Sequence, residues 1–288
     1  MTLLQVKSVS RRFGGVRALN DISFDMQATE ILGLMGANGA GKTTLFSIIA
    51  GNIPPSAGEI WYDDHRIDGL GPHKINRLGI ARTFQIVRPF ANMTVLENVA
   101  VGALYGRSQT KSQRRARERC MQILDEVGLA DRADMLASAL TLAGRKRLEV
   151  ARALATEPRL LLLDEVLAGL NATEARDALD LLRQLRKSRS LSMIVIEHVM
   201  KALMQLSERI IVLHDGLKVM EGVPAEVAND PRVIKAYLGR RSAVPSILEA
   251  RGLHAGYGEV RVLKDVSVGV AHGSITAVIG SNGAAKPR

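Results

Sequence analysis

The sequence predicts an α/β fold built around a mostly parallel sheet. Short apolar runs of strand length alternate with segments of helical spacing, the order expected when helices wind around a parallel sheet. Residues 111–140 show helical spacing without a strand signal, so they are expected to form a helical insertion. The predicted strands are residues 3–9, 22–26, 31–35, 160–163, 193–196 and 210–213.

The composition excludes several classes of protein. Of the 288 residues, 47% are hydrophobic and 24% are charged, which is typical of globular domains and not of disordered or collagen-like chains. Apolar runs stay well short of the ~18–20 residues that cross a bilayer, and the start of the chain lacks the apolar region of a secretory signal. The single cysteine, Cys120, cannot form an intramolecular disulfide. A cytosolic chain is therefore expected.

The charge balance is basic. The 39 Lys and Arg residues exceed the 29 Asp and Glu residues, which gives a formal net charge of +10. Nucleic acid, an anionic membrane surface and nucleotide phosphates are all compatible partners, so charge alone does not choose among them. The basic run at 111–119 is expected to be a solvated helix face.

The beginning of the chain recurs near its end. A shift of 244 positions aligns residues 3–44 with residues 247–288 without a gap, and 13 of the 42 positions are identical. We therefore predict one complete unit over residues 1–240, a linker over 241–246 and the start of a second copy over 247–288.

The strongest motif is a phosphate-binding loop. Residues 36–44 read G-A-N-G-A-G-K-T-T, a full G-x4-G-K-[ST] pattern between a predicted strand and a helical run at 45–50. Its glycines let backbone N–H groups face a phosphate, and the helix N-terminus adds its dipole. Lys42 would reach the β and γ phosphates, and the Thr43 hydroxyl would bind Mg²⁺. The candidate nucleotide ligands are Gly36, Ala37, Asn38, Gly39, Ala40, Gly41, Lys42, Thr43 and Thr44.

Two carboxylates follow the apolar run at 160–163. A buried parallel strand delivers such residues to the carboxyl edge of its sheet. Asp164 would hold Mg²⁺, usually through water, and Glu165 is placed to activate an attacking water as general base.

Between these motifs lie T-L-A-G-R-K-R at 141–147 and A-R-A-L at 151–154, and with them the chain resembles the nucleotide-binding subunits of ATP-binding-cassette (ABC) transporters. The resemblance implies a P-loop NTPase with a mostly parallel RecA-like core sheet, an antiparallel β subdomain and a helical subdomain at about 86–158. Residues 140–144 stand where the family has Leu-Ser-Gly-Gly-Gln. Thr141 keeps a hydroxyl for the γ-phosphate, and Ala143 adds one methyl where a backbone N–H approaches it.

The same resemblance implies roles for three further residues. Phe13 corresponds to the aromatic residue that stacks on adenine. Gln85 corresponds to the glutamine that senses Mg²⁺ and the attacking water, and His198 to the histidine that binds the γ-phosphate. The implied catalytic residues are therefore Glu165, His198 and Gln85, and the implied Mg²⁺ ligands are Thr43, Gln85 and Asp164. Asn171 and Val166 replace the family's usual Asp and Pro.

Four longer segments are similar to LivG-type subunits of branched-chain amino acid importers. They are R-F-G-G-V at 12–16, I-A-R-T-F-Q at 80–85, N-M-T-V-L-E-N-V at 92–99 and D-P-R-V-I-K-A-Y-L-G at 230–239. This similarity implies an ATPase that uses ATP and Mg²⁺ to power uptake of branched-chain or related apolar amino acids. It implies a cytoplasmic location, peripheral on the inner face of the cell membrane.

The family's architecture also implies partners. Two cassettes sandwich two ATP molecules head to tail, so the second cassette would be a LivF-type subunit or a second copy of this chain. Two transmembrane permease subunits and an extracytoplasmic substrate-binding protein complete such an importer, and no direct contact with nucleic acid is expected.

The second copy resembles the start of a LivF-type cassette but departs from it at residues 280–288, which read G-S-N-G-A-A-K-P-R. Ala285 replaces the glycine of the tight turn, and Pro287 removes an N–H donor and the Mg²⁺-binding hydroxyl. We expect no ATP binding there. The late divergence favours a frameshift, a premature stop or a gene fragment over a selected truncation.

Three alternatives stay open. The first is an ABC cassette for another cargo, such as urea or other amides, or an exporter cassette. The second is a soluble ABC ATPase that acts on nucleic acid or ribosomes, which the +10 charge suggests, although such proteins typically carry two full cassettes or long coiled-coil insertions. The third is a regulatory or inactive subunit that binds ATP weakly, which the altered residues 140–144 suggest.

Overall fold

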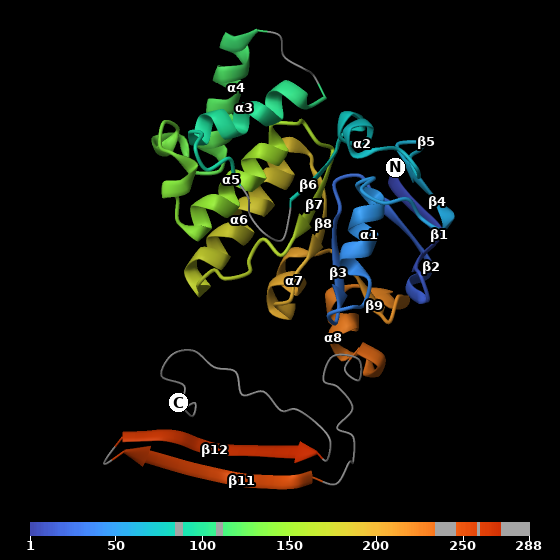
Figure 1. Ribbon diagram of the computed structural model, residues 1–288, viewed down its shortest axis with the longest axis vertical. Helices are drawn as coiled ribbons and strands as arrows, with labels where there is room; N and C mark the ends of the chain where they lie inside the picture. Colours follow the sequence, from blue (N-terminus) through green and yellow to red (C-terminus); the bar gives the residue numbers. More distant parts are fainter. Residues whose placement is uncertain (84–88, 108–111, 234–245, 258–259, 272–288) are drawn as a thin grey trace. The chain divides into compact units, whose positions relative to one another are not determined.

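The computed structural model describes residues 1–83, 89–107, 112–233, 246–257 and 260–271. The chain divides into two compact units, Met1–Tyr237 and Leu238–Arg288. Figure 1 shows the elements of both units.

A six-stranded sheet forms the centre of the first unit, with strand order β10-β9-β3-β8-β7-β6. Each neighbouring pair is parallel except β10 with β9. Strands β3, β7 and β8 are buried along their whole length, which explains their uninterrupted apolar sequences. The predicted mostly parallel α/β fold is confirmed. The strands are β3 (Ile31–Gly36), β6 (Ile80–Arg82), β7 (Leu160–Asp164), β8 (Ser192–Ile196), β9 (Arg209–His214) and β10 (Leu217–Gly222).

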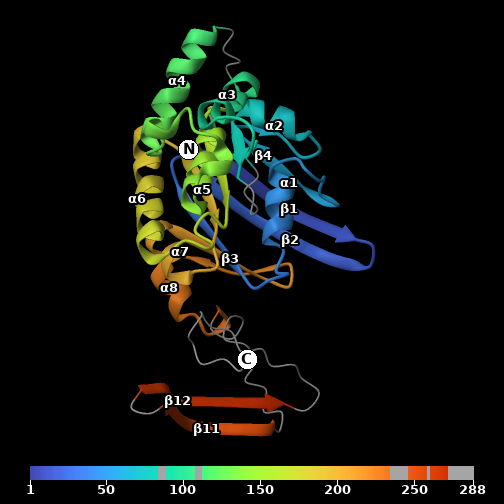
Figure 2. The same ribbon diagram turned by 60° about the vertical axis from the view of Figure 1, so that its left-hand side comes forward.

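Helices pack against this sheet on two sides (Figures 1 and 2). Helices α5, α6 and α7 lie on one face and α1 lies on the other. The helices are α1 (Lys42–Ile49), α2 (Pro72–Leu78), α3 (Val95–Tyr105), α4 (Gln113–Glu126), α5 (Leu142–Leu154), α6 (Ala172–Arg189), α7 (Met200–Leu206) and α8 (Pro224–Asn229), with 3₁₀ turns at Ala130–Arg132 and Ala137–Ala139.

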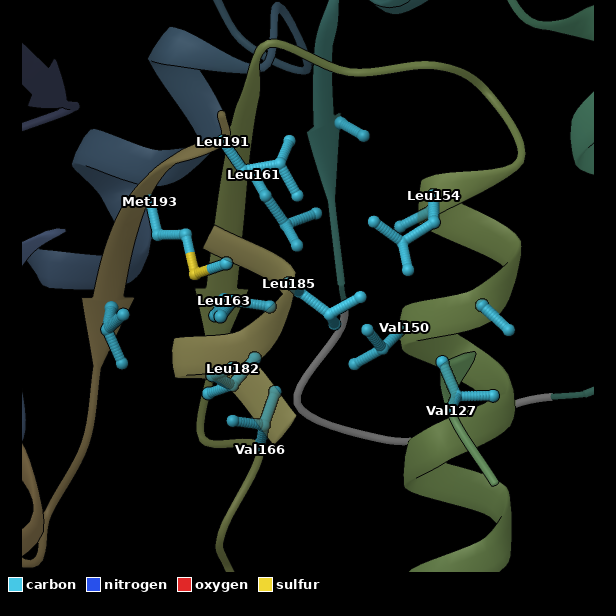
Figure 3. Close-up of a cluster of buried hydrophobic side chains, with 14 of the residues drawn as sticks. Val127, Val150, Leu154, Leu161, Leu163, Val166, Leu182, Leu185, Leu191 and Met193 are labelled. Carbon is cyan, nitrogen blue, oxygen red and sulfur yellow. The ribbon is translucent and has the colours of Figure 1, made fainter. Parts of the chain in front are cut away.

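Alternate residues of the central strands enter two different hydrophobic clusters. In β7, Leu161 and Leu163 belong to the cluster beneath α5 and α6, whereas Leu160 and Leu162 belong to the cluster that includes α1. This alternation follows from the period of two residues in a β-strand. Figure 3 shows part of the first cluster, where side chains from β7, β8, α5 and α6 meet. Both faces of the sheet are thereby covered, and the carboxyl ends of its strands remain to form a site.

A second sheet of the first unit is antiparallel, with strand order β2-β1-β4-β5. Its inward residues join the cluster that includes α1; in β2 these are Leu19, Ile22, Phe24 and Met26. This sheet is the antiparallel part that the family resemblance implied. Its strands are β1 (Thr2–Phe13), β2 (Val16–Gln27), β4 (Ala57–Tyr62) and β5 (His65–Arg66).

Helices α3, α4 and α5 pack on one another between β6 and β7 in the sequence. The predicted helical stretch at 111–140 contains α4 and the two 3₁₀ turns. A capping box starts α3, because Thr94 accepts a hydrogen bond from the Glu97 N–H and the Glu97 carboxylate accepts one from the Thr94 N–H. Within the described residues, no helix is both long enough and apolar enough to cross a membrane.

The second unit contains a hairpin of β11 (Ser246–Tyr257) and β12 (Val260–Ala271). Every pair of partners in this hairpin is a pair of the β1–β2 hairpin displaced by 244 residues. A local irregularity recurs as well. The Ser8 N–H donates to the Ser23 hydroxyl at 2.8 Å, and the Gly252 N–H donates to the Ser267 hydroxyl at 3.0 Å. The repeat in sequence is therefore also a repeat in backbone pairing.

Candidate nucleotide-binding site

The loop between β3 and α1 forms the floor of the site. Gly41 is the N-cap of α1 with φ 101°, in the left-handed region that favours glycine. A Cβ at this position would lie 2.6 Å from the Ala18 carbonyl oxygen and from a Leu19 methyl carbon, so glycine lets the loop pass close to β2. The loop therefore leads directly into the N-terminus of α1, where unpaired N–H groups and the helix dipole attract an anion.

A pocket of about 340 Å³ lies over this loop. It brings Glu165 and His198 together with the loop, although they lie far away in the sequence. It also includes Ala18 of β2, which the sequence motifs did not indicate. The lining residues are Ala18, Asn38, Gly39, Ala40, Gly41, Lys42, Thr43, Thr44, Glu165 and His198. Gly36 and Ala37 enter the site through their carbonyl groups.

The Lys42 ammonium lies inside the loop. Its Nζ donates to the carbonyl oxygens of Gly36 at 2.6 Å and Ala37 at 3.0 Å. Burial lowers the pKa of Lys42, while the charges of Glu165 and Asp164 act to raise it. The lysine is thus held at the place where a phosphate group would rest, and a bound phosphate would provide a stronger acceptor than either carbonyl.

Asp164 ends β7 with a buried carboxylate. Its Oδ2 accepts a hydrogen bond from the Arg82 guanidinium at 2.9 Å, and Arg82 also donates to the Ser47 hydroxyl of α1 at 3.0 Å. The other oxygen, Oδ1, is buried without a hydrogen-bond partner among the described residues. Such an unpaired oxygen fits a hard divalent cation, and the Thr43 hydroxyl lies in the adjacent pocket. The described residues contain no cluster of three His, Cys, Asp or Glu side chains that could hold a metal alone.

Glu165 and His198 meet at the edge of the pocket. They follow β7 and β8, which are parallel neighbours, so both side chains reach the same edge of the sheet. The distance from His198 Nε2 to Glu165 Oε1 is 2.6 Å. Glu165 has φ 52°, and its N–H donates to the Ile196 carbonyl oxygen at 2.9 Å. The two residues are therefore placed to act on one substrate.

Two buried charged residues hold the turn that follows Asp164. The Lys146 ammonium donates to the Glu165 carbonyl oxygen at 2.7 Å, and Glu197 Oε1 accepts from the Leu167 N–H at 2.8 Å. Burial raises the pKa of Glu197 to about 7, and the charge of Lys146 acts in the opposite direction. Lys146 lies in the run at 141–147 and Glu197 precedes His198, but no sequence motif assigned a role to either residue.

Phe13 lies at the tip of the β1–β2 hairpin, where its side chain is partly exposed. The Arg11 guanidinium lies 4.7 Å from the centroid of its ring, which is cation–π geometry. Phe13 is not among the described residues that line the pocket over the loop. The structure thus places Phe13 at the tip of the β1–β2 hairpin, with the Arg11 guanidinium over its ring.

Thr141 and Ala143 lie at the start of α5. Thr141 is the N-cap, and its hydroxyl accepts from the Gly144 N–H at 3.2 Å. Ala143 lines a small apolar pocket between α5 and α6. Neither is among the described residues that line the pocket over the loop, so Thr141 and Ala143 do not contribute to the pocket of their own chain. Gln85 lies outside the described residues.

Asn171 caps α6, with its side-chain oxygen accepting from the Thr173 and Glu174 N–H groups at 3.0 Å. An aspartate at this position would accept the same hydrogen bonds from the first turn of α6. The altered charge at this position leaves the helix cap intact.

A phosphate-binding loop between a buried strand and a helix, with two carboxylates and a histidine at the same sheet edge, defines the site of a P-loop NTPase. Comparison with known families matches residues 19–168 to the ABC transporter family and residues 218–243 to the family of branched-chain amino acid ATP-binding cassette transporters. The chain belongs to the ABC transporter family of ATP-binding proteins, and it is a nucleotide-binding P-loop ATPase.

Individual proteins show the same likeness. The chain is 40% identical to the high-affinity branched-chain amino acid transport ATP-binding protein LivG of Escherichia coli (strain K12), over 82% of this chain and 98% of that protein. It is 39% identical to BraF of Pseudomonas aeruginosa, with the same coverage. The crystal structure of the ADP conformation of MJ1267, an ATP-binding cassette of an ABC transporter, superposes with a TM-score of 0.76 at 28% identity, covering 83% of this chain and 99% of that one.

Proposed function

We propose that this chain is the ATP-hydrolysing subunit of an importer for branched-chain or related apolar amino acids, and that it acts at the inner face of the cell membrane. The observation that carries the hydrolytic role is the contact between Glu165 and His198 in the pocket over the phosphate-binding loop. The cargo is supported by the match of residues 218–243 and by the likeness to LivG and BraF.

The phosphate-binding loop, Lys42 and the Mg²⁺ ligands have separate tasks in this proposal. The loop at 36–44 binds the phosphates of ATP through backbone N–H groups, and Lys42 neutralises charge on the β and γ phosphates. The Thr43 hydroxyl, Asp164 and Gln85 would hold Mg²⁺, which would supply further positive charge to the phosphates, and the unpaired Asp164 Oδ1 supports this role.

Hydrolysis then follows from the arrangement of Glu165 and His198. The oxygen of a water molecule forms a bond to the γ phosphorus while the bond from that phosphorus to the β–γ bridging oxygen breaks. Glu165 accepts a proton from the water. His198 contacts the Glu165 carboxylate in the structure, and with ATP bound its N–H would donate to the γ-phosphate instead. Phe13 offers its ring to the adenine, backed by Arg11.

The proposal includes a second cassette. Thr141 and Ala143 lie outside the pocket of their own chain, which supports an assembly in which they complete the site of a partner. That partner would be a LivF-type subunit or a second copy of this chain. Two transmembrane permease subunits and an extracytoplasmic substrate-binding protein would complete the importer, without direct contact with nucleic acid.

We also propose that residues 1–240 form one ABC domain, with a helical insertion at about 86–158, and that residues 247–288 correspond to the start of a second cassette. The shared register of the two hairpins supports this division. The compact units at Met1–Tyr237 and Leu238–Arg288 support a boundary close to residue 240.

Uptake by the purified complex tests the proposed cargo. The complex is isolated from its own cells through a tag on this chain, reconstituted in proteoliposomes and supplied with labelled leucine, isoleucine, valine or urea. We expect ATP-dependent accumulation of the three amino acids, and none in a complex that carries Lys42→Ala. Accumulation of urea alone contradicts the cargo. Recovery of this chain with nucleic acid, in a salt-dependent manner and without membrane proteins, contradicts the transport role.

A further inference from the structure

Two charged side chains outside the nucleotide pocket converge on the backbone of the turn at 165–167. Lys146 extends from α5 and its Nζ lies 2.7 Å from the Glu165 carbonyl oxygen. Glu197 follows β8 and its Oε1 lies 2.8 Å from the Leu167 nitrogen. The two residues are only 7% and 4% exposed, although Lys and Glu are rarely buried.

Burying these charges is costly unless each one finds a partner. Here each charge is directed to a backbone atom of the same short turn, one to a carbonyl oxygen and the other to an N–H. The two side chains also attract each other, since the charge of Glu197 raises the pKa of Lys146 against the lowering effect of burial. Both side chains therefore keep these hydrogen bonds only while the turn keeps its present conformation.

The turn needs such support because Glu165 is in a sparsely populated conformation. Its φ of 52° lies in the left-handed region, which is unfavourable for a residue with a Cβ. The Glu165 N–H donates to the Ile196 carbonyl oxygen, and the Glu165 carbonyl oxygen accepts from the Ala168 N–H at 3.2 Å as well as from Lys146. The Lys146 ammonium is the charged donor on this oxygen, so its contact adds to the Ala168 hydrogen bond in opposing rotation of the peptide that follows Glu165.

We propose that Lys146 and Glu197 are positioning residues that hold the backbone of Glu165 so that its carboxylate faces the pocket. This inference rests on the proposed role of Glu165 as the general base. Lys146 lies five positions after Thr141 on α5, so the same contact also connects the start of α5 to the base.

The first test separates turnover from binding in the purified complex. Lys146→Met removes the donor and keeps the length of the side chain, Lys146→Arg restores a donor, and Lys187→Met on the exposed face of α6 is the matched control. We expect Lys146→Met to lower kcat at least about 10-fold, with KM for MgATP within about 2-fold of the wild type, because small misplacement of a reacting group slows chemistry. Lys146→Arg should recover most of kcat, and Lys187→Met should leave it unchanged.

The second test examines whether the effect passes through Glu165. In a Glu165→Gln background, Lys146→Met should cause no further loss of residual turnover, because both changes affect one function. Hydrogen exchange of the full chain provides a readout without activity. Lys146→Met and Glu197→Ala should each speed exchange of the amides at 165–168 and leave the loop at 36–44 unchanged.

Several outcomes overturn the proposal. Normal kcat and normal exchange in Lys146→Met would show that the contact does not position the turn. A loss of kcat accompanied by weaker ATP binding and a lower melting temperature in both Lys146→Met and Lys146→Arg would show a purely structural role. Normal hydrolysis by Glu165→Gln would instead remove the proposed base, and the exchange data would still decide whether Lys146 and Glu197 hold the turn.

Discussion

His198 Nε2 lies 2.6 Å from Glu165 Oε1, although 33 positions separate the two residues in the chain. The parallel pairing of β7 with β8 produces this contact, because it carries the residues after both strands to one edge of the sheet. An imidazole N–H that donates to the carboxylate fixes the direction of both side chains. The second ring nitrogen of a neutral imidazole then carries no proton and can act only as an acceptor.

Removal of the imidazole should therefore slow hydrolysis more than it weakens binding. We expect His198→Ala to lower kcat by about 100-fold or more, while the affinity for ATP changes by less than about 5-fold. The matched control is His214→Ala, because His214 ends β9 and its only described ion pair is a 3.6 Å contact with Asp215. Steady-state ATPase assays and nucleotide-binding titrations measure the two effects. Equal losses in both histidine variants would contradict the assigned role.

Arg82 and Asp164 should couple stability to Mg²⁺. Their ion pair is nearly buried, so Arg82→Leu removes the guanidinium that is bonded to the Asp164 carboxylate and should destabilise the protein by about 3 kcal/mol. A bound divalent cation would replace part of the lost charge. MgATP should therefore raise the melting temperature of Arg82→Leu more than that of the wild type, whereas ATP with EDTA should not.

The control for Arg82 is Arg66→Leu. Arg66 pairs with Glu59 and Asp68, but its side chain is half exposed, so its loss should destabilise the protein much less than the loss of Arg82. Equal melting temperatures of Arg82→Leu and wild type with and without MgATP would refute the coupling.

Glu197 should make stability depend on pH. Its pKa is raised from 4.5 to about 7 in the folded chain, mainly by burial, so the folded state holds this proton more tightly than the unfolded state. The stabilisation is complete below pH 4.5 and is lost as the pH rises through 7, by up to about 3 kcal/mol. The side chain of Glu197→Gln does not titrate in this range. Urea unfolding at pH 5 and pH 8 should show a smaller loss of stability in Glu197→Gln than in the wild type, and parallel losses would contradict the raised pKa.

Phe13 should contribute to binding and not to chemistry. Because stacking on adenine is the same before and during hydrolysis, Phe13→Ala should raise KM for ATP by about 5- to 10-fold and leave kcat nearly unchanged. Arg11→Ala should raise KM less, since Arg11 supports the ring from behind. Phe13→Tyr serves as the conservative control. A fall in kcat at unchanged KM would place Phe13 in a different role.

The sequence is informative wherever a local pattern has one physical explanation. The apolar run before Asp164 could only be a buried strand with its acids at the sheet edge, and β7 has this form. The loop at 36–44 occurs in its expected place between β3 and α1. The α/β fold was predicted from such patterns and the ABC family from a resemblance of residues 141–154 and the flanking motifs; both are confirmed. Short strands were missed, because the three residues of β6 show no periodicity.

The contacts that hold the site were not predictable in the same way. Arg82 meets Asp164 across 82 positions of sequence, and Lys146 meets Glu165 from a helix whose burial depends on the packing of α5 against the sheet. A lysine in a basic stretch normally indicates a solvated face. Only the folded arrangement shows that Lys146 is buried while Arg145 and Arg147 on either side of it are half-buried.

One experiment addresses the central claim most directly: ATP turnover and ATP retention by the purified complex carrying Glu165→Gln. Glutamine keeps the size of the side chain and removes its basic carboxylate, so the nucleotide should bind and remain unhydrolysed. We expect turnover to fall by at least about 100-fold while intact ATP stays bound through gel filtration. Turnover at the rate of the wild type, or release of the nucleotide as ADP, would contradict the role of Glu165 and the mechanism built on it.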